Sequence, residues 1–121
     1  MNYYKFIKEG FPEIILEITN INDENTDQTT CGSVYSALFE YTLKSFKDGS
    51  LEAQKIEKIM NIIENTLNHG SQNLQEAATI SFLEDLTNKN FSELYNYSKK
   101  YIGEKSKIQI SEINKFWKNE A

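Results

Sequence analysis

The stretch NLQEAATISFLEDLTN, residues 73–88, decides the fold of this chain. Asn73 and Glu76 have the spacing of a capping box, which predicts that a helix begins here. Small residues, Ala77 and Ala78 among them, precede the large apolar residues of one helical stripe. Neighbouring helices approach closely where side chains are small, so we expect this helix at the centre of a bundle. The stripe consists of Leu74, Phe82, Leu83 and Leu86.

Two helices joined by a short turn precede this stretch. Apolar residues recur at helical spacing over residues 33–48 and again over 51–69. Ser33 is placed to cap the first helix and Ser50 to cap the second, which is the longest one expected. Only Gly49 and Ser50 separate them, so they must fold back as an antiparallel hairpin. The expected core positions are Val34, Tyr35, Leu38, Phe39, Thr42, Leu43, Phe46, Ile56, Ile59, Met60, Ile62, Ile63 and Leu67.

Further helices are expected toward both ends of the chain. Residues 12–20 have isoleucines at helical spacing, although the same residues also suit a short strand. Asn90 and Glu93 form a second capping box, and a last helix covers about residues 105–118. Within it, KIQIS (107–111) alternates weakly like a strand. The patterns predict an all-α fold: a compact bundle of about five to seven helices built from antiparallel helical hairpins.

Composition favours a single domain over residues 1–121 and narrows its class. The chain is 39% hydrophobic, well above the range of disordered proteins. Its net charge of −5 argues against general binding to nucleic acid or to membrane surfaces. A lone Cys31 suits a reducing compartment, and the first residues lack the apolar core of a signal peptide. No stretch approaches the about 20 apolar residues of a membrane span, so we expect a cytoplasmic protein.

The charge is divided unevenly along the chain. Residues 1–88 are acidic, whereas residues 89–121 carry seven lysines and four acids. Three of the acids, Asp23, Glu24 and Asp27, lie in a polar stretch over residues 20–32 that reads as a loop. Long loops in compact domains are often functional, and a solvated linker is the alternative.

The sequence contains no catalytic or metal-binding motif. His69, the only histidine, sits at a predicted helix end, where capping of free carbonyls explains it. A nucleophile–base pair of Cys31 and His69 lacks any supporting signature, and it would require both residues to line one pocket. The five glycines are isolated, and no calcium-loop pattern occurs. We therefore expect a protein that is not an enzyme and that needs no cofactor or metal.

Packing residues along most of the chain resemble those of one family. They are Phe11–Pro12, Val34–Tyr35, Gly70, Ala77, Ser81–Phe82–Leu83–Glu84, Tyr101–Ile102–Gly103 and Phe116–Trp117. This order is similar to an uncharacterised bacterial family of small acidic helical proteins. Some of its members resemble immunity proteins of contact-dependent inhibition and other polymorphic toxin systems. The family pattern carries no catalytic residues to transfer.

The resemblance implies an immunity protein that binds and neutralises a cognate toxin domain. Such a toxin is expected to be basic, for example a nuclease, and acidic residues would then form the contact surface. The alternative is a non-catalytic helical adaptor or a homo-oligomeric structural module. The candidate partner-binding residues are Asp23, Glu24, Asp27, Glu40, Asp48 and Glu52, with Glu84 and Asp85 as weaker candidates.

Overall fold

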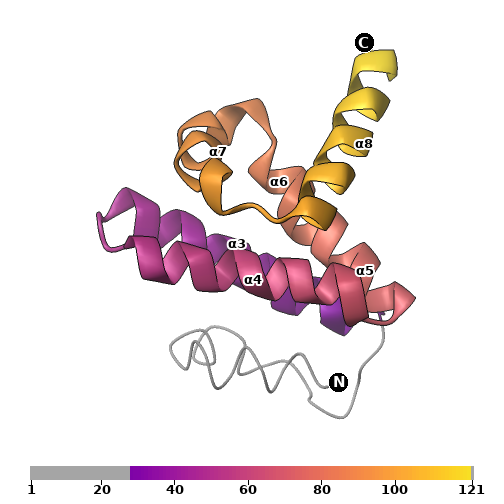
Figure 1. Ribbon diagram of the computed structural model, residues 1–121, viewed down its shortest axis with the longest axis horizontal. Helices are drawn as coiled ribbons and strands as arrows, with labels where there is room; N and C mark the ends of the chain where they lie inside the picture. The colour runs from indigo at the N-terminus through magenta and orange to yellow at the C-terminus, as the bar shows by residue number, and fades with distance from the viewer. Residues whose placement is uncertain (1–27, 121) are drawn as a thin grey trace.

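The computed structural model describes residues 28–120, which fold into helices only (Figure 1). The longer helices are α3 (Gln28–Lys47), α4 (Ala53–His69) and α8 (Glu104–Glu120). The central helix is continuous but has three parts: α5 (Gln72–Ala78), a π-helical turn (Thr79–Leu83) and α6 (Glu84–Leu86). The shorter α7 (Ser92–Ser98) lies between two 3₁₀ turns, Lys89–Phe91 and Lys99–Tyr101. The predicted all-α bundle is confirmed, while the helix expected at residues 12–20 lies outside the described residues.

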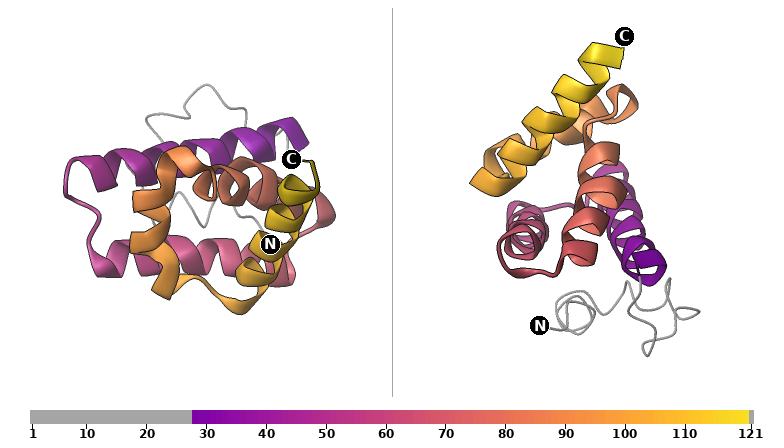
Figure 2. Two further views of the ribbon diagram at one scale, coloured as in Figure 1. Left: turned by 90° about the horizontal axis from the view of Figure 1, so that it is seen from above. Right: turned by 90° about the vertical axis from the view of Figure 1, so that its right-hand side faces the viewer.

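The central helix packs against the α3–α4 hairpin and lies at the centre of the bundle, as the sequence predicted. α3 and α4 run antiparallel, and the α5–α6 segment packs against both of them (Figures 1 and 2). Ala77 and Ala78 are buried at this contact, as their small size predicted. The Phe39 ring meets the Phe82 ring edge to face, with centroids 5.6 Å apart. α8 then crosses α4 and the π-turn, which adds Ile110 to the same core.

Most of the expected core residues are buried, and one polar pair joins them. The Tyr35 hydroxyl lies 2.6 Å from the Thr66 hydroxyl, which bridges α3 and α4 in the interior. Thr66 Oγ1 donates its hydrogen to the Ile62 carbonyl, so we assign Tyr35 as the donor in the bridge. Leu43 and Phe46, expected in the core, are only partly buried. The buried apolar residues of the hairpin are Val34, Tyr35, Leu38, Phe39, Tyr41, Leu51, Ile56, Ile59, Met60, Ile62, Ile63 and Leu67.

The predicted start of the first hairpin helix was wrong. α3 begins at Gln28, so Ser33 is an internal residue, and residues 28–32 of the expected loop are helical. With 20 residues, α3 and not α4 is the longest helix of the described part. The polar residues of 28–32 can continue a helix whose apolar face already packs from Val34 onward. Residues 20–27 of the expected loop lie outside the described range.

The hairpin turn also differs in its capping. Ser50 does not cap α4, because its hydroxyl lies 2.5 Å from the Asp48 carboxylate within the turn. Gly49 adopts a positive φ of 81°, a conformation that glycine reaches without a steric penalty. Leu51 then turns inward and is buried, which delays the start of α4 to Ala53. The antiparallel hairpin itself formed as expected.

Neither predicted capping box exists in the structure. The central helix is capped by Ser71, whose hydroxyl accepts a hydrogen bond from the Leu74 amide, so Asn73 lies in the first turn. Asn88 bonds the Asn90 amide in a 3₁₀ turn, and α7 starts only at Ser92. An earlier polar residue therefore caps the central helix, whereas α7 follows a capped 3₁₀ turn and has no side-chain cap of its own. Residues 107–111, weakly strand-like in sequence, are helical within α8.

Candidate protein-binding surface

The predicted acidic residues separate into groups once the chain is folded. Glu40 on α3 and Asp85 on α6 are both exposed, and α6 directly follows the π-turn that packs against α3. Partial burial raises the pKa of the Asp85 carboxyl, and the nearby charge of Glu40 raises this pKa further. Two carboxylates that were 45 positions apart in the sequence thus share one electrostatic environment.

The surface next to this pair continues along the central helix. Ser81 faces α3 at Gly32, and Asp85 follows one turn later on the same row. Ile80 and Glu84 form the adjacent row, again one turn apart. Ile80 is 54% exposed, a high value for a large apolar side chain. We call Glu40, Glu84, Asp85 and Ile80 the acidic face.

The acids at the hairpin turn have a different environment. Asp48 accepts hydrogen bonds from the amide and the hydroxyl of Ser50, and these bonds lower the pKa of Asp48. The charges of Lys44 and Lys55 lower this pKa further. Glu52 is exposed and precedes α4. The carboxylate of Asp48 is therefore already partnered within the chain, unlike that of Asp85.

Three predicted contact residues, Asp23, Glu24 and Asp27, lie outside the described residues. Of the remaining five, the structure brings Glu40 near Asp85, leaves Glu84 beside Asp85 on α6, and leaves Asp48 and Glu52 at the hairpin turn. Asp85, one of the weaker candidates by sequence, thus pairs with Glu40. This pairing depends on how the central helix packs against α3, which sequence spacing alone does not show.

A further carboxylate has a structural role that the sequence did not reveal. Glu64 on α4 accepts hydrogen bonds from the Lys105 amide (2.9 Å), the Ser106 amide (3.0 Å) and the Ser106 hydroxyl (2.9 Å). It thereby caps the first turn of α8 from a different helix. A Cβ atom at Gly103 would lie 2.4 Å from the Glu64 carboxyl carbon, so a larger residue there would displace this carboxylate from its capping position. Burial acts to raise the pKa of Glu64, but the hydrogen bonds outweigh it and the net shift is downward.

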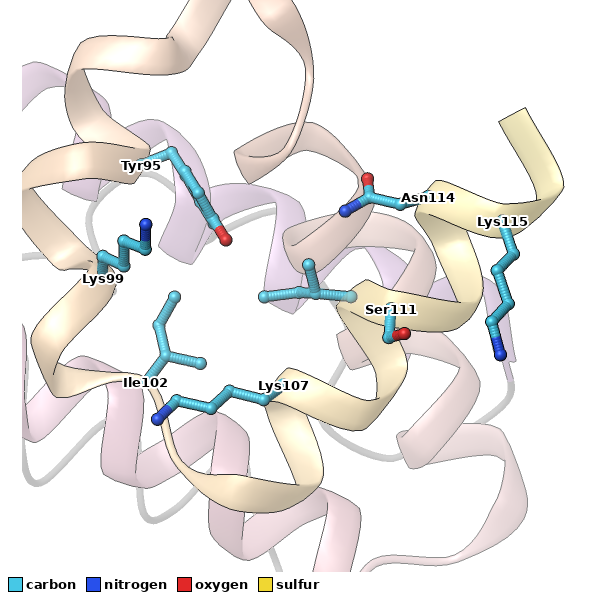
Figure 3. Close-up of a pocket in the computed structure, with 8 residues that line it drawn as sticks. Tyr95, Lys99, Ile102, Lys107, Ser111, Asn114 and Lys115 are labelled. Carbon is cyan, nitrogen blue, oxygen red and sulfur yellow. The ribbon is translucent and has the colours of Figure 1, made fainter. Parts of the chain in front are cut away.

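A pocket of about 410 Å³ lies between α7, the 3₁₀ turn after it, and α8 (Figure 3). Sequence reasoning missed it, and its only signal was the excess of lysine over acid in residues 89–121. The charge of its rim is opposite to that of the acidic face. The residues that line it are Tyr95, Lys99, Ile102, Lys107, Ile110, Ser111, Asn114 and Lys115.

The described residues offer little for catalysis or metal binding. His69 is exposed at the end of α4, and the antiparallel hairpin brings this end near the start of α3, which contains Cys31 (Figure 1). No group of three His, Cys, Asp or Glu residues within the described part is arranged to hold a metal ion. Every buried side-chain nitrogen and oxygen described here has a hydrogen-bond partner. In residues 28–120, no helix is both long and apolar enough to cross a membrane.

Comparison with known proteins identifies a family but no named relative. A family model described as Domain of unknown function (DUF7674) matches residues 4–118. No curated protein and no solved structure matches the chain.

Proposed function

Because this chain belongs to the family of DUF7674 domains of unknown function, we propose its role from its own surface: it is a non-catalytic protein that binds a basic protein partner through the acidic face. The specific form of the proposal is an immunity protein that neutralises a cognate toxin domain, as the sequence resemblance implies. Its support from the structure is the placement of Glu40 and Asp85.

The main support for the proposal is the environment of the Asp85 carboxylate. Its carboxylate is partly desolvated and lies near a second negative charge, so ionisation of Asp85 is less favourable in the folded chain than in water. A cationic side chain placed between Glu40 and Asp85 relieves that cost, because it neutralises both carboxylates at once. Like-charged groups kept close on a surface are stabilised by a partner of opposite charge.

Ile80 supplies the apolar part that a protein interface needs. Interfaces commonly combine an apolar anchor with charged residues at the rim, and Ile80 lies exposed one turn from Glu84. The negative charge steers a basic partner during association, and burial of Ile80 slows dissociation. This combination fits a basic protein better than a small cation, which gains nothing from the exposed isoleucine.

The first test is protection in cells. The chain is co-expressed with a basic toxin domain encoded beside its gene, and survival and co-purification are measured. Survival with a co-purified complex is the expected result. If the complex forms without protection, the binding proposal stands and the immunity role is overturned. If neither is observed with a toxin domain encoded there, the immunity proposal is overturned.

The second test locates the interface within such a complex. Glu40→Gln with Asp85→Asn should slow association and reduce its dependence on salt concentration. The matched control is Glu57→Gln with Glu93→Gln, which removes the same charge from exposed positions on α4 and α7. Equal effects of both pairs would show that net charge, and not the acidic face, governs binding. Ile80→Ser should instead raise the dissociation rate.

A further inference from the structure

The pocket between α7 and α8 combines an apolar floor with positive charge. Ile102 and Ile110 are buried at its base, and the half-buried Tyr95 ring forms one wall. In Figure 3 the side chains of Lys99 and Lys107 flank Ile102, while the amide of Asn114 reaches in from α8. The Tyr95 hydroxyl points toward the middle of this arrangement (Figure 3). No carboxylate lines the pocket.

Lys99 and Lys107 differ from the other lysines nearby. Lys115 lies at the edge of the pocket with its ammonium group 3.9 Å from Glu112, and Lys100 lies over the Tyr101 ring. Neither Lys99 nor Lys107 has an ion-pair partner within the described residues. Two ammonium groups that flank one apolar surface repel each other, and an anion bound between them removes that repulsion.

We propose that this pocket binds a small organic anion with an apolar body, of the acyl- or aryl-carboxylate class. Its volume of about 410 Å³ is suited to such a ligand. The apolar body lies over Ile102 and Ile110, and the carboxylate pairs with the ammonium group of Lys99 or of Lys107, which lie on opposite sides of Ile102 (Figure 3). The Tyr95 hydroxyl and the Asn114 amide are further donors at the pocket.

The same geometry favours a carboxylate over a phosphate. Phosphate sites commonly use arginine or the free amides of a helix N-terminus. The chain has no arginine, and Glu64 already occupies the Lys105 and Ser106 amides at the start of α8. What remains for a ligand is two ammonium point charges beside the apolar surface of Ile102 and Ile110, and that surface favours an anion with a hydrocarbon body over inorganic phosphate.

The test is titration of the full chain with octanoate, followed by amide chemical shifts in NMR spectra. We expect saturable shifts at Tyr95, Ile102, Lys107 and Asn114, and no comparable shifts with the neutral octanamide. Lys99→Gln with Lys107→Gln should weaken octanoate binding about tenfold, and added salt should weaken it in the unsubstituted chain. 3-Phenylpropionate tests the aryl form in the same way.

Lys89→Gln with Lys100→Gln is the matched control, because it removes two charges from exposed residues outside the pocket. This control should retain the affinity for octanoate to within about twofold. Equal losses in both double variants, equal binding of octanamide, or no shifts at millimolar octanoate would each overturn the proposal. Well-dispersed spectra of both variants verify that they fold. The acidic face lies on α3, the π-turn and α6, away from the residues that line the pocket, so failure here leaves the protein-binding proposal intact, and the reverse also holds.

Discussion

At the scale of single residues, two carboxylates show how position decides the effect of a charge. Glu64 and Asp85 are both partly desolvated, but only Glu64 gains hydrogen bonds from amides and a hydroxyl. The pKa of Glu64 is therefore lowered and that of Asp85 is raised. Ionised Glu64 stabilises the fold, whereas ionised Asp85 opposes it. An exposed acid whose ionisation lowers the stability of the fold is better explained by a role in binding than by a role in folding.

We predict that Asp85→Asn stabilises the protein slightly at neutral pH, by at most about 0.5 kcal/mol because the site is exposed. The folded-state pKa of Asp85 lies above its unfolded value, so the cost of ionisation is present at neutral pH. That cost disappears as the pH falls below the unfolded value, and the gain of the variant should disappear with it. Urea denaturation at neutral and acidic pH measures both effects. A loss of stability at neutral pH contradicts this account.

Glu64→Gln should have the opposite effect and destabilise the fold by about 1–2 kcal/mol at neutral pH. The folded-state pKa of Glu64 lies below its ordinary value of 4.5. The stabilisation is thus fully present above that value and is lost as the pH falls through the folded-state pKa. Unfolding curves of variant and unsubstituted chain should converge in acid. Glu57→Gln on the same helix is the control, with a change within about 0.5 kcal/mol.

At the scale of elements, the central helix departs most from its predicted form. Its first cap is Ser71 and its middle contains the π-turn Thr79–Leu83. The wider turn adds a residue without ending the helix, and it keeps Phe82 and Leu83 buried while Ile80 faces outward. The helix propensities of the individual residues do not predict a π-turn. The turn lies where the central helix contacts α3 and α8.

Two substitutions distinguish the real cap from the predicted one. Ser71→Ala should cost about 1 kcal/mol, because the Leu74 amide loses its side-chain partner. Asn73→Ala should change stability little or raise it slightly, since Asn73 is an exposed first-turn residue and alanine favours helix. Thermal unfolding followed by circular dichroism compares the two. A larger loss for Asn73→Ala would restore the capping box.

The close approach of the central helix is tested at Ala78. This residue is fully buried, and Ala78→Leu should destabilise the fold by about 1–3 kcal/mol through overpacking. Asn73→Leu places the same side chain on the exposed side of the same helix and should cost much less. Denaturant midpoints measure both variants. Similar losses would mean that the packing at Ala78 is not the cause.

At the scale of the whole molecule, one core joins all the described helices. The central helix contacts α3 and α4, and α8 contacts α4 and the π-turn. We therefore expect one unfolding transition, with far-ultraviolet and near-ultraviolet circular dichroism giving the same midpoint. The Glu64→Gln variant should shift both signals together. Separate midpoints would show that α8 unfolds independently of the α3–α4 hairpin.

The helical class, the antiparallel hairpin and nearly all of the core were predictable from the order of residues. These follow from local causes: apolar residues at helical spacing, a two-residue connection through Gly49, and small residues such as Ala78. Helix starts were predicted less well, because several polar residues compete for each cap and tertiary contacts select among them. Ser71 in place of Asn73 is one example.

Which charges lie close together depends on how the helices pack and could not be predicted from residue spacing. The tertiary structure joined Glu40 with Asp85, partnered Asp48 within its turn, used Glu64 to cap a distant helix, and placed Lys99 with Lys107 around an apolar floor. A helical pattern is visible in the sequence because it relates residues three or four positions apart. The environment of a carboxylate instead depends on groups that packing brings within a few ångströms, whatever their separation along the chain.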